Sequence, residues 1–232
     1  MTKKIKLECT GDPDKEYPDK IVIGIDEAGK GPIAGPMYAG IVTFGLMADY
    51  EDDVIELGLK DSKQLSEKKR EKIGTDIKSM VNIESATMLV VEMPADEIDK
   101  AVNMNDLFDK YVAKGLRNLL QRHTGLVGKK LESFIKHDCI VLMDGNRKIK
   151  GIPQDIQIAR PKLDATSWAM AAASIIAKNA QVKYMRKLHK ESPEYEFGSH
   201  KGYGTKAHFE AIKKNGFHDE HRKSWIKSEK IK

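Results

Sequence analysis

The sequence predicts an α/β protein in which helices flank a central mixed β-sheet. Short apolar runs rich in β-branched residues, such as 21–25 and 139–143, are typical of buried strands. Longer segments dominated by Ala, Met and Lys, above all 165–178, are typical of helices. The chain has 232 residues, of which 40% are hydrophobic, enough for one good core with at most a small appended subdomain. We therefore expect one main domain.

The first half of the chain contains three predicted elements after a polar beginning. Residues 1–19 are polar and interrupted by glycine and proline, so we expect an irregular arm or an edge strand there. Strands are predicted at about 20–26 and 37–44, on either side of a proline-containing turn. Ser66 resembles a helix cap before charged helix formers, which predicts a helix to about Met80.

The second half of the chain also alternates predicted strands and predicted helices. Residues 84–91 alternate weakly and then become apolar, which predicts a strand, and 138–143 predicts another. Residues 96–121 are expected to be helical with interruptions. A long helix at about 164–190 and a shorter one at 205–215 complete a mixed α/β chain.

Charge is concentrated near the C-terminus. The net charge is +5, and residues 200–232 carry nine Lys or Arg against four Asp or Glu. Charge alone favours a solvated tail, but a basic arm would also suit a polyanionic substrate. We divide the chain into an N-terminal arm (1–19), a main domain (20–195) and a helical extension (196–232).

The compartment is predicted from what the sequence lacks. No apolar stretch is long enough to span a bilayer, and the N-terminal residues do not resemble a signal peptide. Cys9 and Cys139 show neither metal-ligand spacing nor a disulfide framework, and Cys139 falls in a predicted core strand. We expect a cytoplasmic monomer that does not contact a membrane.

Four acids stand at the ends of predicted elements. Asp26 and Glu27 follow the first apolar strand, Asp144 follows another strand, and Asp164 directly precedes the Ala-rich helix. Taken singly, the first three suit ordinary loops and Asp164 suits a helix N-cap. Together they can converge at one edge of the sheet, and converged carboxylates call for a hard cation such as Mg²⁺ or Mn²⁺.

Several motifs follow one another along the chain. They are Asp26-Glu27-Ala28-Gly29-Lys30-Gly31-Pro32, Asp61-Ser62-Lys63-Gln64-Leu65, Asp144, Lys162-Leu163-Asp164, Ala173-Ser174-Ile175-Ile176-Ala177-Lys178 and His200-Lys201-Gly202-Tyr203-Gly204-Thr205. Together, and in this order, they resemble type 2 ribonuclease H (ribonuclease HII) from about residue 21 to about 221. The resemblance implies a ribonuclease H-like fold around a mixed sheet, with a catalytic domain at 20–195 and a substrate-binding helical extension at 196–232. It also implies that the four acids are the catalytic, metal-binding residues, with two Mg²⁺ or Mn²⁺ ions.

The same resemblance implies the substrate. The family cleaves RNA paired with DNA and incises 5′ of a single ribonucleotide in duplex DNA, leaving 3′-hydroxyl and 5′-phosphate ends. The glycine loop, in which Lys30 replaces the more common Arg, would sense the 2′-hydroxyl through its backbone. Tyr203 would stack on the sugar of the nucleotide 3′ to the scissile phosphate. By this resemblance the substrate-binding residues are Gly29, Lys30, Gly31, Lys63, Ser174 and Tyr203.

Two other classes of function have weaker support in the sequence. Gly24-x-x-x-x-Gly29-Lys30 is nearly a P-loop of a nucleotide triphosphatase, but Gly31 stands where that loop needs Ser or Thr. A non-catalytic nucleic-acid-binding module would require the four acids to be incidental. The sequence leaves open a sliding-clamp partner and the geometry of residues 145–162.

Six further residues carry weaker signals of function. The spacing of His218 and His221 does not match a zinc-hydrolase pair, so we expect a polar surface turn there. Trp168 and Met170 are expected to pack into the core. His200 and His208 could be structural or could contact substrate, and neither is assigned.

Overall fold

The computed structural model describes residues 11–45, 51–60, 62–82 and 86–230. Five strands form one mixed sheet in the order β3-β2-β1-β4-β5. The central strand β1 runs antiparallel to β2 and parallel to β4, which in turn pairs in parallel with β5. The strands are β1 (Ile21–Ala28), β2 (Met37–Thr43), β3 (Thr87–Met93), β4 (Cys139–Asp144) and β5 (Gln157–Arg160).

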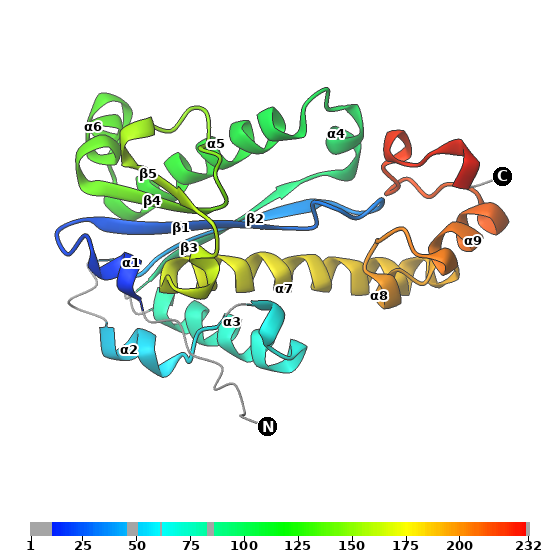
Figure 1. Ribbon diagram of the computed structural model, residues 1–232, viewed down its shortest axis with the longest axis horizontal. Coiled ribbons are helices and arrows are strands. Elements are labelled where there is room, and N and C mark those ends of the chain that lie inside the picture. The colour runs from blue at the N-terminus through cyan, green and yellow to red at the C-terminus, as the bar shows by residue number, and fades with distance from the viewer. Residues whose placement is uncertain (1–10, 46–50, 61, 83–85, 231–232) are drawn as a thin grey trace.

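Helices cover both faces of this sheet. Figure 1 shows α5 and α6 on one face and the long α7, with α3 beyond it, on the other, while α8 and α9 lie past one end. None of the described helices is long and apolar enough to cross a bilayer. The helices are α1 (Asp12–Lys15), α2 (Glu51–Glu56), α3 (Glu67–Asn82), α4 (Ala95–Lys100), α5 (Met104–Thr124), α6 (Gly128–Asp138), α7 (Trp168–Glu191), α8 (Phe197–His200) and α9 (Lys206–Asn215).

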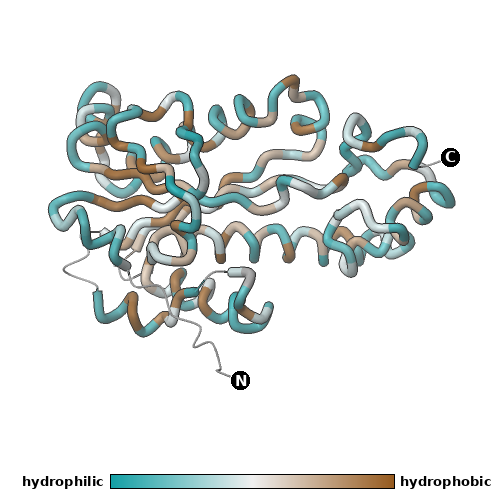
Figure 2. Tube along the Cα trace, viewed as in Figure 1, coloured by the Kyte–Doolittle hydropathy of each residue, from teal (hydrophilic) through white to brown (hydrophobic). Residues whose placement is uncertain are grey.

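The alternation of side chains along the strands builds a core on each face. Ile23, Ile25 and Ile41 pack on the α5 side of the sheet. Val42 packs on the other side against α3 and α7. In Figure 2 the hydrophobic residues gather along the central strands, whereas the outer loops are mostly hydrophilic. The predictions that Trp168 and Met170 are core residues are confirmed, since both are buried.

Helix α7 lies unusually close to the central strand. A Cβ atom built on Gly24 of β1 would lie 2.2 Å from the Ala169 carbonyl carbon, a distance that no side chain tolerates. Only glycine therefore lets the backbone of α7 approach β1 here. This approach places the following turns of α7 beside the carboxyl end of β1, where the predicted acids stand.

The start of α7 differs from the sequence prediction. The helix begins at Trp168, and its N-cap is Ser167, whose hydroxyl accepts a hydrogen bond from the Met170 amide. Asp164 lies upstream, in the 3₁₀ turn Leu163–Ala165, so the interpretation of Asp164 as the N-cap is wrong. The actual cap includes Asp14 of α1, whose buried carboxylate accepts hydrogen bonds from the Trp168 and Ala169 amides.

The C-terminal segment corrects another expectation. The expected polar turn is present at Asp219 and Glu220, but His221 lies outside it, because this residue is 2% exposed and forms an isolated β-bridge with Ala34. Its ring nitrogen lies 2.9 Å from that of His208 on α9, which is also buried. Packing between α9 and the segment after it therefore removes both rings from solvent.

Candidate active site

The four predicted acids lie around the carboxyl ends of β1 and β4. Asp26 and Glu27 are the sixth and seventh residues of β1, and Asp144 ends the neighbouring parallel strand β4. Because parallel strands end at the same edge of a sheet, these three residues stand at one edge. Asp164, 8% exposed, reaches the same region from the turn before α7.

The electrostatics of Asp26 show that these acids influence one another. The pKa of Asp26 is raised to about 7, chiefly by burial and in addition by the negative charges of Glu27 and Asp164. A hydrogen bond from Ser174 acts in the opposite direction. A carboxylate so placed is stabilised by any cation that binds nearby.

Two serines hold Asp26 in place. Ser174 on α7 donates to Asp26, and its oxygen lies 2.8 Å from the Ser62 hydroxyl. Both serines are buried, so this chain of hydrogen bonds is shielded from solvent.

A cavity of about 340 Å³ opens between β1, β4 and α5. Glu27 and Asp144 both line it, which places two of the predicted acids in one hollow. The full lining is Glu27, Lys30, Met37, Met104, Asn105, Phe108, Met143, Asp144, Gly145, Asn146 and Arg147.

The donor set fits a hard divalent cation. All four candidate ligands are carboxylates, the oxygen donors that Mg²⁺ and Mn²⁺ prefer. In the described ranges, however, no three acidic, histidine or cysteine side chains already meet in a metal-binding cluster. Protein groups engage two of the acids instead: Asp144 Oδ1 accepts from the Lys162 amide at 2.6 Å, and Glu27 lies 3.5 Å from Lys30 Nζ. Ion binding would therefore draw these side chains inward.

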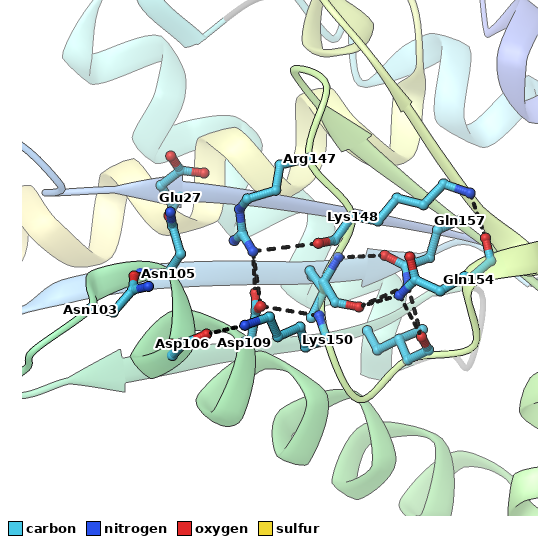
Figure 3. Close-up of polar contacts among 12 residues, drawn as sticks. Glu27, Asn103, Asn105, Asp106, Asp109, Arg147, Lys148, Lys150, Gln154 and Gln157 are labelled. Atoms are coloured by element: carbon cyan, nitrogen blue, oxygen red, sulfur yellow. Dashed lines mark hydrogen bonds and ion pairs between the residues drawn. The ribbon is translucent and has the colours of Figure 1, made fainter.

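The loop after Asp144 is anchored by residues that the sequence did not indicate. Figure 3 shows Arg147 directed to Asp109 of α5, with hydrogen bonds of 2.7 and 2.9 Å. The Lys150 amide donates to the same carboxylate at 3.1 Å. Buried Gln157 of β5 accepts from the Ile149 amide at 2.7 Å. These contacts fix the wall of the cavity that carries Asn146 and Arg147.

The predicted glycine loop follows β1 directly. Gly29 has φ of +86°, and a Cβ there would lie 2.9 Å from the Pro36 carbonyl oxygen, so the position requires glycine. The chain then enters the antiparallel strand β2 rather than a helix, which excludes a P-loop, because that motif connects a strand to a helix N-terminus.

The remaining predicted substrate residues are only partly brought together. Tyr203 is 44% exposed, and a Cβ on Gly31 would lie 3.5 Å from its Cε1 atom, so ring and loop are neighbours. The Lys30 side chain is exposed. Ser174 faces Asp26 rather than solvent. Lys63 belongs to the 3₁₀ turn Ser62–Gln64, but its side chain lies outside the described residues.

Solved structures share this architecture. The ribonuclease H2 of Pyrococcus horikoshii is similar with a TM-score of 0.69 and 28% identity, over 90% of this chain and 96% of that one. A structure described as the PCNA:RNase HII complex from Archaeoglobus fulgidus matches with a TM-score of 0.66 and 25% identity, over 89% and 96%. Bst-RNase HIII in complex with Mn²⁺ shares the fold, with a TM-score of 0.63, 18% identity and coverage of 87% and 65%.

Sequence comparison is more specific. The ribonuclease HII of Fusobacterium nucleatum is 41% identical over 216 residues, which are 92% of this chain and 88% of that protein. The ribonuclease HII of Endomicrobium trichonymphae is 39% identical over 87% and 83% of the two chains. The family model for Ribonuclease HII matches residues 23–228. The chain therefore belongs to the ribonuclease HII family of ribonuclease H hydrolases, as its motifs predicted.

Proposed function

We propose that this enzyme hydrolyses RNA in RNA/DNA hybrids and incises duplex DNA on the 5′ side of a single embedded ribonucleotide. The reaction would use two divalent cations, Mg²⁺ or Mn²⁺, and leave 3′-hydroxyl and 5′-phosphate ends. The observation that carries the proposal is the position of Asp26, Glu27 and Asp144 at the neighbouring carboxyl ends of β1 and β4, at the base of the glycine loop.

The proposed ligands are Asp26, Glu27, Asp144 and Asp164. Bound divalent cations would lower the pKa of an attacking water and stabilise the leaving 3′-oxygen. The protein's own contribution is orientation: Ser174 fixes the Asp26 carboxylate, and the anchored loop after β4 holds Asp144 at the cavity. No side chain needs to act as a nucleophile.

Substrate selection is assigned to two segments. One is the loop after β1, and the other is the turn at residues 200–205, called the Tyr203 turn. The 2′-hydroxyl is the local difference between a ribonucleotide and its deoxy neighbours, and backbone groups near Gly29 and Gly31 can approach it closely. The ring of Tyr203, which is exposed and lies beside Gly31, would stack on the next sugar. Lys30 and Lys63 are proposed to contact phosphates of the substrate. Residues 196–232 are proposed to form a substrate-binding extension.

A sliding-clamp partner is a separate proposal. It rests on the likeness to the Archaeoglobus fulgidus structure, which is described as a complex with PCNA. Co-elution of this chain with the clamp of its own host during gel filtration would support it, and separate elution would refute it.

Three labelled duplexes test the main proposal: all-DNA, RNA/DNA, and DNA with one ribonucleotide. With Mg²⁺ or Mn²⁺ we expect cutting of the second and third only, and none with a chelator. Cutting of the all-DNA duplex at a comparable rate would instead indicate a general nuclease. Absence of cutting with either ion would refute the proposal.

A further inference from the structure

Arg222 is a fully buried cation, with 0% of its surface exposed. Among the described residues no carboxylate forms an ion pair with it. Its guanidinium instead donates five hydrogen bonds to four backbone carbonyls of the segment that follows β1. The acceptors are Gly29 O at 2.8 Å, Lys30 O at 3.2 Å, Pro32 O at 2.8 Å and Gly35 O at 2.9 and 2.7 Å.

Such burial is costly for the fold alone. Burial lowers the pKa of Arg222 to about 10, which still leaves the group charged at neutral pH. Buried charges are weak evidence for stability, because hydrophobic residues of similar volume often stabilise a core as well or better. What the guanidinium supplies instead is a fixed geometry, since its planar fork dictates where each carbonyl must lie.

Fixed carbonyls also fix the amides on the same peptide planes. In a trans peptide the C=O and N–H bonds point in opposite directions. The Gly29 and Lys30 carbonyls face Arg222, so the amides of Lys30 and Gly31 face away from it. No acceptor for either amide is found within the described ranges. These two donors are therefore available to a bound ligand.

The peptide between Pro32 and Ile33 links the same loop to the segment around Tyr203. The Pro32 carbonyl accepts from Arg222, and the Ile33 amide on the same peptide plane donates to Gly202 O at 2.9 Å. Gly202 directly precedes Tyr203. Arg222 thus connects the loop after β1 to the Tyr203 turn through one peptide group.

The residue before Arg222 braces the same turn from the other side. His208 Nδ1 lies 2.9 Å from Tyr203 O and must donate, since a carbonyl only accepts. His208 Nε2 is then the acceptor for His221 Nε2–H at 2.9 Å. His221 Nδ1 is left to accept from the His218 amide at 2.7 Å. Each ring therefore has a single neutral tautomer, and together they fix the Tyr203 carbonyl.

We propose that Arg222 is a positioning residue that orients the Lys30 and Gly31 amides toward the ribose and, with His221, fixes the separation between that loop and Tyr203. This rests on the proposed function. Arg222 touches no substrate itself. The group that would bind to the Lys30 and Gly31 amides is a hydrogen-bond acceptor, namely a sugar hydroxyl or a phosphate oxygen.

Arg222→Lys and Arg222→Met test this proposal, with Arg117→Met as the matched control, because Arg117 pairs with Glu132 on the exposed surface. Loss of folded protein lowers cutting of every substrate by the same factor. Misplaced amide donors, by contrast, should lower the cleavage rate more on DNA with a single ribonucleotide, where the ribose and the adjoining deoxyribose must both be recognised. We expect a loss on the order of 100-fold on a single embedded ribonucleotide. The loss on a continuous RNA/DNA hybrid should be at least about tenfold smaller.

An unchanged ratio between the two substrates, in variants that unfold cooperatively, would overturn the proposal. Inability of the wild type to cut either substrate would instead refute the proposed function. If neither variant folds, ¹⁵N relaxation of the free wild-type protein decides. We expect order parameters near the rigid value of about 0.85 at Lys30 and Gly31, and values below about 0.6 would overturn the positioning role.

Discussion

Arg147 donates to both carboxylate oxygens of Asp109, at 2.7 and 2.9 Å, and thereby joins the loop after β4 to helix α5. The Asp109 side chain is 3% exposed, whereas that of Arg147 is 39% exposed and stacks over Phe108. The carboxylate also accepts from the Lys150 amide. One buried acid therefore accepts from two residues of the loop that borders the proposed active site (Figure 3).

Replacing Asp109 should destabilise the protein. Asp109→Ala leaves the Lys150 amide and the Arg147 guanidinium without their acceptor, so we expect a loss of about 1–3 kcal/mol in the free energy of unfolding. Urea denaturation measures it. Asp106→Ala on the same helix is the control, because its ion pair with Lys150 is exposed and should contribute less than about 1 kcal/mol. Equal losses in the two variants would contradict the anchoring role.

Asp14 should make stability depend on pH. Burial raises its pKa from 3.8 to about 6, so the folded protein binds a proton more tightly than the unfolded chain does. Below about pH 4, Asp14 contributes roughly 2–3 kcal/mol to the free energy of unfolding. This contribution is lost as the pH rises through 6.

Unfolding by urea between pH 4.5 and 7.5, with a chelator present, tests this prediction. The difference in stability between wild type and Asp14→Asn should fall as pH rises, because the amide does not titrate. Asp12→Asn, on the exposed side of the same helix, should follow the wild type. A difference between wild type and Asp14→Asn that does not change with pH would show that Asp14 does not titrate in this range.

Ser174 should act on the proposed metal site through Asp26. Ser174→Ala removes the hydrogen bond that orients this carboxylate, so we expect the Kd for Mn²⁺ to rise about 10–100-fold. Ser62→Ala should have a smaller effect, because Ser62 reaches Asp26 only through Ser174. Calorimetric titration measures both. Unchanged Mn²⁺ affinity in Ser174→Ala would leave Ser174 as a packing residue or, as its motif implies, a substrate contact.

Tyr203 should matter most at a junction between one ribonucleotide and DNA. We expect Tyr203→Ala to lose about tenfold more activity on a single embedded ribonucleotide than on a continuous hybrid, since stacking on the following sugar is lost. Tyr203→Phe should retain most activity because the ring remains. Steady-state cleavage of both substrates measures the ratio. Equal losses for Tyr203→Ala would assign the residue to general binding or to the fold.

Local patterns predicted much of the fold. The strands around Ile23 and Val141 are short apolar runs, and the acids that follow them stand where a buried strand must reach solvent. Helix α6 was missed, although Leu131, Phe134 and Ile135 have helical spacing. Strand β5 was missed because its four residues carry little pattern of their own.

Long-range partners could not be predicted. Asp14 lies in a polar segment, and nothing local indicates that it caps a helix more than 150 residues away. His221 and Arg222 belong to a basic, polar stretch that favours a solvated arm, yet both are buried by contacts with the loop after β1 and with α9. Their roles depend on tertiary packing, which a single sequence does not display.

The central claim is that Asp26 is a metal-binding residue of a ribonucleotide-specific nuclease. Its most direct test is cleavage of a duplex containing one ribonucleotide, mapped at nucleotide resolution with Mg²⁺ or Mn²⁺, by wild type and by Asp26→Asn. We expect a single cut 5′ of the ribonucleotide by the wild type. A folded Asp26→Asn variant should lose activity by more than about 100-fold. Activity of Asp26→Asn within a few-fold of the wild type would contradict the account.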